Sequence, residues 1–140
     1  MNRQFRRSCQ SGFSLLEVLI TLVIIAIGMM GFAAMMLNSM KNNRTTMERS
    51  IATFYAYDII DCMRANRAGV PNGYDIDFGE TPSGTTVADD DLTLWKNALS
   101  SLLPSGDGEI EIRSSGNTVT VTVRIQWTGA SQPWETESTL

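Results

Sequence analysis

The chain has 140 residues, of which 43% are hydrophobic and 19% charged, and its formal net charge is −4. This length allows one small domain beside a membrane segment, and the acidic balance argues against nucleic acid as a partner. The sequence contains no histidine, so it lacks the commonest general base and the commonest metal ligand.

The N-terminal segment joins a short basic leader to a long apolar run. Arg3, Arg6 and Arg7 precede a run from Phe13 to Leu37 in which Glu17 is the one charged residue. The run is long enough to cross a bilayer as a helix, since roughly 20 apolar residues suffice. It is too long for the apolar core of a cleaved secretory signal, which has roughly 7–15 residues. The arginines predict a cytoplasmic N-terminus and a head that faces the periplasm.

Glu17 is the unusual residue of this run. A carboxylate inside a membrane segment costs about 2.5–3.5 kcal/mol on insertion scales, so a functional role is its default interpretation. A buried carboxylate also needs a positive partner. The sequence therefore predicts that Glu17 meets a cation or reaches the membrane interface.

The order of a basic leader, Gly12, Phe13, Glu17 and an apolar helix resembles the class III signal of type IV pilins and type II secretion pseudopilins. The resemblance implies that a prepilin peptidase cuts between Gly12 and Phe13, which makes residues 1–12 the leader peptide, and then N-methylates Phe13. It also implies that Glu17 forms an assembly ion pair with the N-terminal amine of a neighbouring subunit. Pairing with the amine of its own chain, or snorkelling to the interface, is the alternative.

The helical pattern continues beyond the apolar run. Apolar residues at spacings of three and four predict one face of an amphipathic helix, formed by Met40, Met47, Ile51, Phe54, Tyr55, Ile59, Cys62 and Met63. The segment from Gly69 to Gly73, which contains Pro71, predicts the stop. We therefore expect one long helix over residues 13–68, with a transmembrane segment over about residues 13–37.

The two cysteines, Cys9 and Cys62, lie on opposite sides of the apolar run, so they cannot pair across a membrane. We interpret Cys62 as a small apolar packing residue.

Two stretches of the helix, Ile27–Ala33 and Asp58–Ala68, resemble the type IV pilus modification protein PilV family of minor pilins. The chain differs from that family at Cys62, where arginine is common. It has Ala34 where many major pilins place a helix-kinking proline. This resemblance covers the first half of the chain well and implies a minor pilin rather than a major one.

Residues 69–140 are expected to form a globular periplasmic head. Residues 69–88 are rich in glycine, proline, aspartate and threonine and predict a loop. The run Asp89–Asp91 precedes a short amphipathic helix that Pro104 ends. We interpret these aspartates as helix-capping residues rather than as a calcium site, because their spacing is not that of a calcium-binding loop.

The last part of the chain alternates apolar and polar residues, which is the pattern of half-buried strands. It predicts three antiparallel strands at Glu109–Arg113, Thr118–Trp127 and Trp134–Leu140. Their apolar face would cover the amphipathic half of the long helix. The expected fold class is therefore α+β and type IV pilin-like, with one long N-terminal helix packed on a small antiparallel sheet.

The sequence has no Cys-x-x-Cys, Gly-rich phosphate loop or Gly-x-Ser-x-Gly motif, and acidic pairs such as Glu109 and Glu111 fit an outward, solubilising face. We therefore expect no enzyme activity, no catalytic residues, no metal, no cofactor and no small-molecule substrate. The expected function is that of a minor pilin that assembles into a type IV pilus or primes its assembly, with roles in twitching motility or adhesion.

The alternatives are a minor pseudopilin of a type II secretion system and a membrane-anchored binding module that needs no leader cleavage. The expected partners of a minor pilin are other major and minor pilins, which bind through the N-terminal helix, and the prepilin peptidase. Its expected location is the inner membrane, as a single-pass protein, and then the pilus filament.

Overall fold

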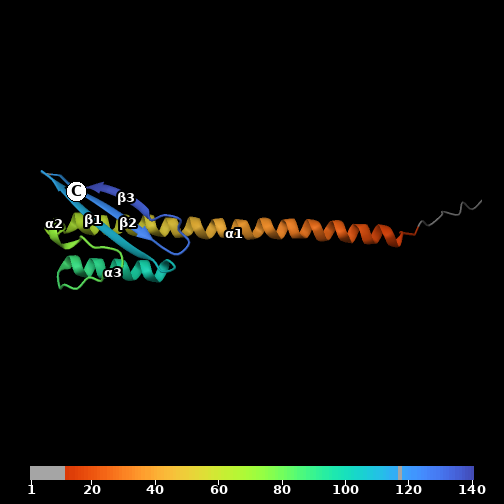
Figure 1. Cartoon of the computed structure of the whole chain (residues 1–140), viewed down its shortest axis with the longest axis horizontal. Helices are drawn as coiled ribbons and strands as arrows, with labels where there is room; N and C mark the ends of the chain where they lie inside the picture. Colours follow the sequence, from red (N-terminus) through yellow and green to blue (C-terminus); the bar gives the residue numbers. More distant parts are fainter. Residues whose placement is uncertain (1–11, 117) are drawn as a thin grey trace, which may run out of the picture. The chain divides into compact units, whose positions relative to one another are not determined.

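The computed structural model describes residues 12–116 and 118–140. In chain order, its elements are α1 (Leu15–Ala65), α2 (Val70–Gly73), α3 (Val87–Leu102), β1 (Asp107–Ser115), β2 (Thr118–Gln126) and β3 (Trp134–Thr139) (Figure 1). Most of the predicted leader, with Arg3, Arg6, Arg7 and Cys9, lies outside the described residues. The chain divides into two compact units between Asn43 and Arg44, within α1.

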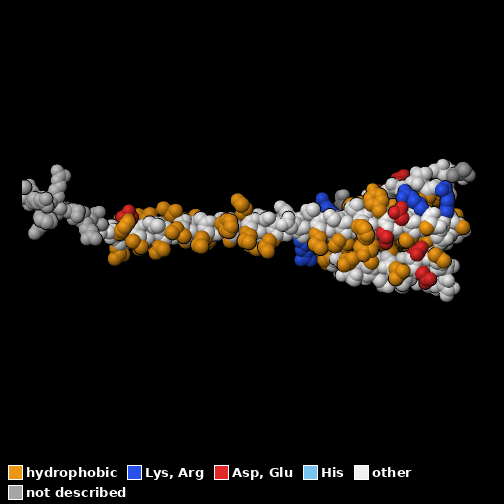
Figure 2. Space-filling model, turned by 180° about the vertical axis from the view of Figure 1, so that it is seen from behind, with side chains coloured by type: hydrophobic (Ala, Val, Ile, Leu, Met, Phe, Trp, Pro, Cys, Tyr) orange, Lys and Arg blue, Asp and Glu red, His pale blue; other side chains and the backbone are white. Residues whose placement is uncertain are grey.

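The first unit contains the apolar part of α1. The large hydrophobic side chains of this part are exposed, and Figure 2 shows them along the face in view. The helix includes a stretch that is long and apolar enough to cross a membrane, and none of that stretch is buried inside the protein. A continuous apolar surface of this kind is stable where lipid or other apolar helices surround it.

The second unit is built around the remainder of α1, from Arg44 onward. The sheet has the order β1-β2-β3, and both strand pairs are antiparallel. On its inner face lie alternate residues of β2, among them Val121, Val123 and Ile125, all fully buried. The expected α+β architecture, with a long helix packed on a three-stranded antiparallel sheet, is therefore confirmed.

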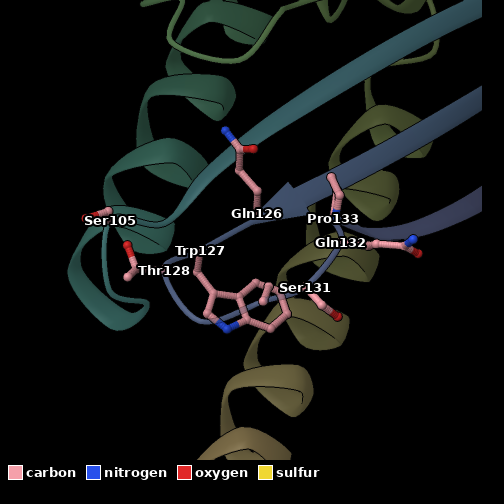
Figure 3. A pocket seen from close by; sticks show the side chains of 8 residues that line it. Ser105, Gln126, Trp127, Thr128, Ser131, Gln132 and Pro133 are labelled. Atoms are coloured by element: carbon pink, nitrogen blue, oxygen red, sulfur yellow. The ribbon is translucent and has the colours of Figure 1, made fainter.

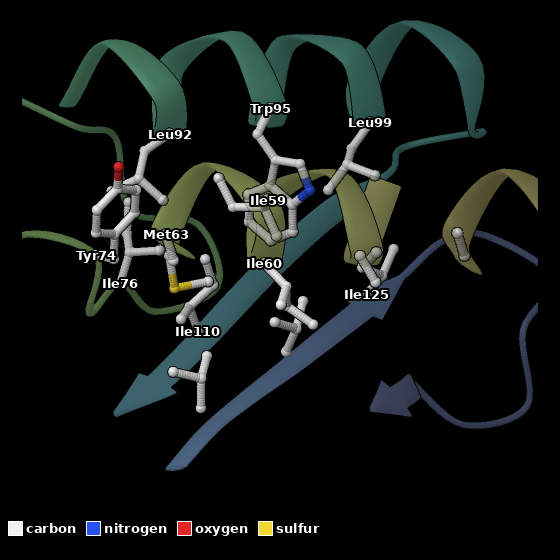
Figure 4. Packing of buried hydrophobic residues seen from close by; sticks show 14 of the residues in the cluster. Ile59, Ile60, Met63, Tyr74, Ile76, Leu92, Trp95, Leu99, Ile110 and Ile125 are labelled. Atoms are coloured by element: carbon white, nitrogen blue, oxygen red, sulfur yellow. The ribbon is translucent and has the colours of Figure 1, made fainter. Parts of the chain in front are cut away.

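The core of the head combines side chains from α1, α3 and the inner face of the sheet. Figure 4 shows side chains of α3 and of the strands pointing toward α1. Burying each large side chain of this kind contributes about 1.5–3 kcal/mol. The main contributors are Ile59, Ile60 and Met63 of α1, Leu92, Trp95 and Leu99 of α3, and Ile110, Val121, Val123 and Ile125 of the sheet.

The buried face of α1 differs from the predicted one. Ile59 and Met63 are buried as expected, but Met47 and Phe54 remain 66% and 65% exposed, and Met40 is exposed as well. The buried face instead includes Ala52 and Ala56, both at 0% exposure, together with Ile60. Alanine lets a helix approach its neighbours closely, and the large apolar residues on the opposite side are left in solvent. The half-buried residues Ile51, Tyr55 and Cys62 lie at the margin of the core.

The long helix ends three residues earlier than predicted, at Ala65. A turn follows, in which the Gly69 N–H donates to the Asn66 carbonyl at 2.9 Å. The short helix α2 comes next, in a segment predicted as loop. Pro71 is tolerated in its first turn because backbone N–H groups there have no intrahelical partner.

Of the three aspartates predicted to cap α3, the structure confirms this role for Asp89. The Thr86 hydroxyl accepts the Asp89 N–H at 3.3 Å, and the Asp89 carboxylate accepts the Thr86 N–H at 2.9 Å. This reciprocal pair is a capping box, and it begins the helix at Val87, before the aspartates. Asp91 has a different partner and does not cap the helix.

Asp91 accepts a hydrogen bond from the buried hydroxyl of Tyr74 at 2.5 Å. The same hydroxyl accepts from Asn66 Nδ2 at 3.2 Å, so it connects the residue after α1 with α3. Burial, and after it the hydrogen bond to Asp91, raise the pKa of Tyr74 to about 12. The ring is held as a neutral phenol at physiological pH.

This network predicts how the stability of the head varies with alkaline pH. Below pH 10, Tyr74 is protonated in the folded and the unfolded chain, and its contribution to stability is complete. As the pH rises from 10 to about 12, the unfolded chain loses the proton first, so the free energy of unfolding falls. Thermal unfolding followed by near-UV circular dichroism should show this fall. Tyr74→Phe should remove this component of the pH dependence and cost about 1 kcal/mol at pH 7.

The close approach of β1 to α3 gives a second prediction. A Cβ atom on Gly108 would overlap the ring of Trp95 and come within 2.9 Å of Leu99 Cδ1. The Trp95 ring is fixed because its Nε1–H donates to the Tyr55 carbonyl at 2.9 Å. We expect Gly108→Ala to destabilise the head by about 1–3 kcal/mol in chemical denaturation. Ser115→Ala, at an exposed position of the same strand, is the control and should stay within about 0.5 kcal/mol of the wild type.

Candidate functional site

The predicted cleavage position lies just before α1. Gly12 and Phe13 are both exposed and precede the first helical residue, Leu15. Phe13 is 84% exposed, and nothing lies within 4 Å of where a Cβ of Gly12 would stand. Exposed backbone outside regular structure is where peptidases act most readily. The bond between Gly12 and Phe13 is therefore sterically open to a peptidase.

Ser14 occupies the position that begins the helix. Its carbonyl accepts the N–H of Glu17 at 3.0 Å and that of Val18 at 3.3 Å. Ser14 was not among the residues predicted from the sequence. The spacing Ser14-x-x-Glu17 is that of a capping box, and it could have identified this residue. Ser14 therefore stands at the N-cap position of α1, with its backbone carbonyl accepting the first hydrogen bonds of the helix.

Glu17 lies in the first turn of α1 and is exposed. The N-terminal end of a helix carries a partial positive charge, and a carboxylate there gains about 0.3–1 kcal/mol. The Glu17 carbonyl accepts the Thr21 hydroxyl at 2.7 Å, which leaves the carboxylate out of that contact. No salt bridge joins Glu17 to any residue within 12–116 or 118–140.

The geometry brings Gly12, Phe13 and Glu17 to one end of one helix. An amine created at Phe13 would stand at the positive end of the helix dipole, where a cation is unfavourable without a nearby anion. Glu17, one turn into the helix, is a carboxylate in that position. The arrangement can therefore neutralise a new terminal charge, either within the chain or across to a neighbour.

The head carries a second charged cluster, on the outer face of the sheet. Arg124 of β2 binds Glu111 of β1 at 3.2 Å, Glu135 of β3 at 2.7 Å, and Glu109 of β1. Hydrogen bonds from Arg113 and then from Arg124 lower the pKa of Glu111. The outward position expected for Glu109 and Glu111 is thus observed, and pairing with arginine stabilises the ionised form of Glu111.

Cys62 is half-buried and free. Burial raises the pKa of its thiol, and the negative charges of Asp91, Asp58 and Asp61 raise it further. A thiol held protonated in this way is a poor nucleophile and a poor metal ligand. This environment supports the interpretation of Cys62 as a packing residue. Among the described residues, no group of three or more Cys, Asp or Glu side chains is arranged to hold a metal ion.

A shallow hollow lies beside the turn between β2 and β3, where it is lined by Ser105, Gln126, Trp127, Thr128 and residues 130–133 (Figure 3). All of its lining side chains are uncharged. The hollow therefore offers neither a general acid nor a general base.

The comparisons with known proteins agree with the geometry at the start of α1. Residues 7–33 match the prokaryotic N-terminal methylation motif. No curated protein and no solved structure matches the chain. The motif is a class III signal, which implies processing by a prepilin peptidase and assembly with pilins, and its apolar helix is consistent with an inner-membrane pilin. The motif is typical of type IV pilins and pseudopilins, which are structural proteins rather than enzymes, and the long helix packed on a three-stranded sheet is a pilin-like α+β arrangement.

Proposed function

We propose that this chain is a minor pilin of the PilV kind, which assembles into a type IV pilus or primes its assembly. One observation carries the proposal: the methylation motif, residues 7–33, includes the start of α1, where the apolar side chains from Leu15 to Leu37 are exposed. Such a surface is costly in water and favourable in lipid or against other apolar helices. A protein that passes from a membrane to a bundle of like helices meets both conditions.

The assembly step we propose centres on the charges at the start of α1. Cleavage between Gly12 and Phe13 releases the leader and creates a positive amine, which the peptidase then methylates. In the inner membrane, with the N-terminus cytoplasmic and the head periplasmic, Glu17 of one subunit binds the Phe13 amine of its neighbour. Pairing offsets the cost of about 2.5–3.5 kcal/mol that an unpaired carboxylate carries inside a membrane. The pair also sets the axial position of adjacent helices.

The end of α1 supports a pilus rather than a secretion role. The stretch Asp58–Ala68 resembles minor pilins. Its Arg64 forms hydrogen bonds within the head. The Arg64 guanidinium donates to Asp61 at 2.8 Å and to the Ser138 hydroxyl of β3 at 3.0 Å. These bonds join the segment that resembles minor pilins to the sheet, and we propose that adjacent pilins contact this surface. We propose twitching motility or adhesion as the process that this surface serves.

The first test is the mass of the mature protein. In cells with an active prepilin peptidase, we expect a chain that begins at methylated Phe13, measured by intact and N-terminal peptide mass spectrometry. The same measurement in a peptidase-deficient strain is the control and should give the uncleaved chain. A chain that retains residues 1–12 in peptidase-positive cells would refute the proposed cleavage and favour a membrane-anchored binding module.

The second test separates charge from packing at Glu17. We expect Glu17→Ala and Glu17→Gln to be cleaved normally but to lower the number of pili at least tenfold, because the neighbour's amine loses its anion. Thr21→Val, one turn further along the helix, is the matched control and should leave pilus number unchanged. Pili are counted by electron microscopy, and twitching is measured on the same strains.

The Glu17 strains and a deletion strain also distinguish the proposed pilus role from a role in type II secretion. Normal piliation with both Glu17 variants would contradict the intersubunit ion pair. If deletion of the whole chain spared pili but stopped protein secretion, the protein would be a pseudopilin of a type II secretion system.

A further inference from the structure

The two edges of the sheet differ in their hydrogen bonding. Along β1, Ile110 and Ile76 exchange backbone hydrogen bonds at 2.9 and 3.1 Å. The Asp75 carboxylate also accepts the N–H of Ile112 at 3.4 Å. Along the far side of β3, no backbone pairing with another described residue occurs. The edge of β1 is thus partly covered by its own chain, while the edge of β3 is open.

One hydrogen bond identifies the backbone groups that face this open edge. The Leu140 N–H donates to the Val119 carbonyl at 2.9 Å, and the pairing continues without interruption through Val121 and Ser138. In an antiparallel ladder, alternate residues turn their N–H and C=O groups to opposite sides. Residues 134, 136 and 138 therefore face β2, and Glu135, Glu137 and Thr139 face outward.

The side chains of these outward-facing residues share the charged outer face of the sheet. Glu135 lies opposite Arg124, and Glu137 lies opposite Thr122. Arg124 is already bound by three carboxylates, and no ion pair joins Glu137 to a residue in the described part of the chain. The open edge consequently combines unpaired backbone donors and acceptors with excess negative charge.

We propose that the edge of β3 binds an extended segment of a partner protein that carries lysine or arginine at alternate positions. Such a segment would add a fourth strand by backbone hydrogen bonding, and its cations would lie directly across from Glu135 and Glu137. Charge complementarity selects this occupant. The strand itself contains no proline and no bulge that would block pairing.

The same charges disfavour a second copy of this chain at the edge. In an antiparallel pairing of two β3 strands, a register centred on Glu137 places that residue opposite itself. A register centred on Thr136 places Glu135 opposite Glu137. Like charges directly across a ladder are destabilising. Charged residues on exposed edges commonly prevent self-association, and here they do so while leaving the edge open to a basic strand.

This inference concerns the head alone and is independent of the proposed role of α1 in a filament. The head would capture a partner protein through a segment of the partner that is unstructured before binding.

The test uses the full chain in non-ionic detergent and a fluorescent eight-residue peptide of alternating lysine and valine. We expect saturable binding by fluorescence anisotropy. The double variant Glu135→Lys/Glu137→Lys should weaken it at least fivefold. Thr139→Pro removes one outward N–H without changing the charge, and it should weaken peptide binding about threefold to tenfold. Asp58→Lys, a single exposed charge reversal on α1, is the control for general electrostatic attraction and should change the affinity for the peptide less than twofold.

Near-UV circular dichroism verifies that each variant keeps a folded head. Failure of the wild-type chain to bind the peptide at millimolar concentration would overturn the proposal. Equal binding of a peptide with glutamate in place of lysine would also overturn it, because the charge selection would be absent. Equal weakening by Asp58→Lys would show general electrostatic attraction, and unchanged binding by Thr139→Pro would show that no strand is added.

Discussion

The burial of one face of α1 against the sheet is the interaction on which the head depends. Ala52, Ala56, Ile60 and Met63 supply a smooth face at zero exposure, and the inner sides of β2 and α3 close over it. Because the same helix continues N-terminally into an apolar stretch with no protein cover, one element must satisfy two environments. Small residues in the part of α1 within the head let the helix pack tightly. The N-terminal part of α1 is apolar on all sides, which suits it to lipid or to neighbouring helices.

Electrostatics impose a second constraint at the start of that helix. The positive end of the helix dipole accommodates Glu17 before any processing. A new amine at Phe13 would be poorly placed without it. The proposed ion pair therefore couples a covalent event, the removal of the leader, to the ability of the helix to pack with others. Assembly before processing would leave a carboxylate in an apolar bundle with no cation to meet.

Much of this architecture was predictable from local patterns. Strict alternation in Thr118–Trp127 predicts both the strand and its buried face, because the side-chain period of a strand is two. The end of α1 and the start of α3 follow from glycine, proline and capping residues to within a few positions. The burial of Ala52 and Ala56 was not predictable from hydrophobicity, since larger apolar residues such as Met47 and Phe54 give the stronger signal on the opposite side.

The interactions that escaped prediction join residues far apart in the sequence. Tyr74 meets Asp91 and Asn66 only once α3 has packed beside the end of α1, and no local period encodes that meeting. The site at Gly12, Phe13 and Glu17 is the reverse case. The residue types and their spacing were enough to predict this site from the sequence. The structure adds that the residues are exposed and that Ser14 stands at the N-cap position.

The placement of the tryptophans has a practical consequence for spectroscopy. Trp95, Trp127 and Trp134 all belong to the head, and the apolar part of α1 has none. Trp95 is buried against α1 and Trp127 binds Glu48 through its Nε1–H at 3.1 Å, so each senses how firmly the head holds the helix. Intrinsic fluorescence of the intact protein therefore reports on the head alone, even in micelles or membranes. Quenchers confined to the lipid phase should leave this emission unaffected as long as the head stays in water.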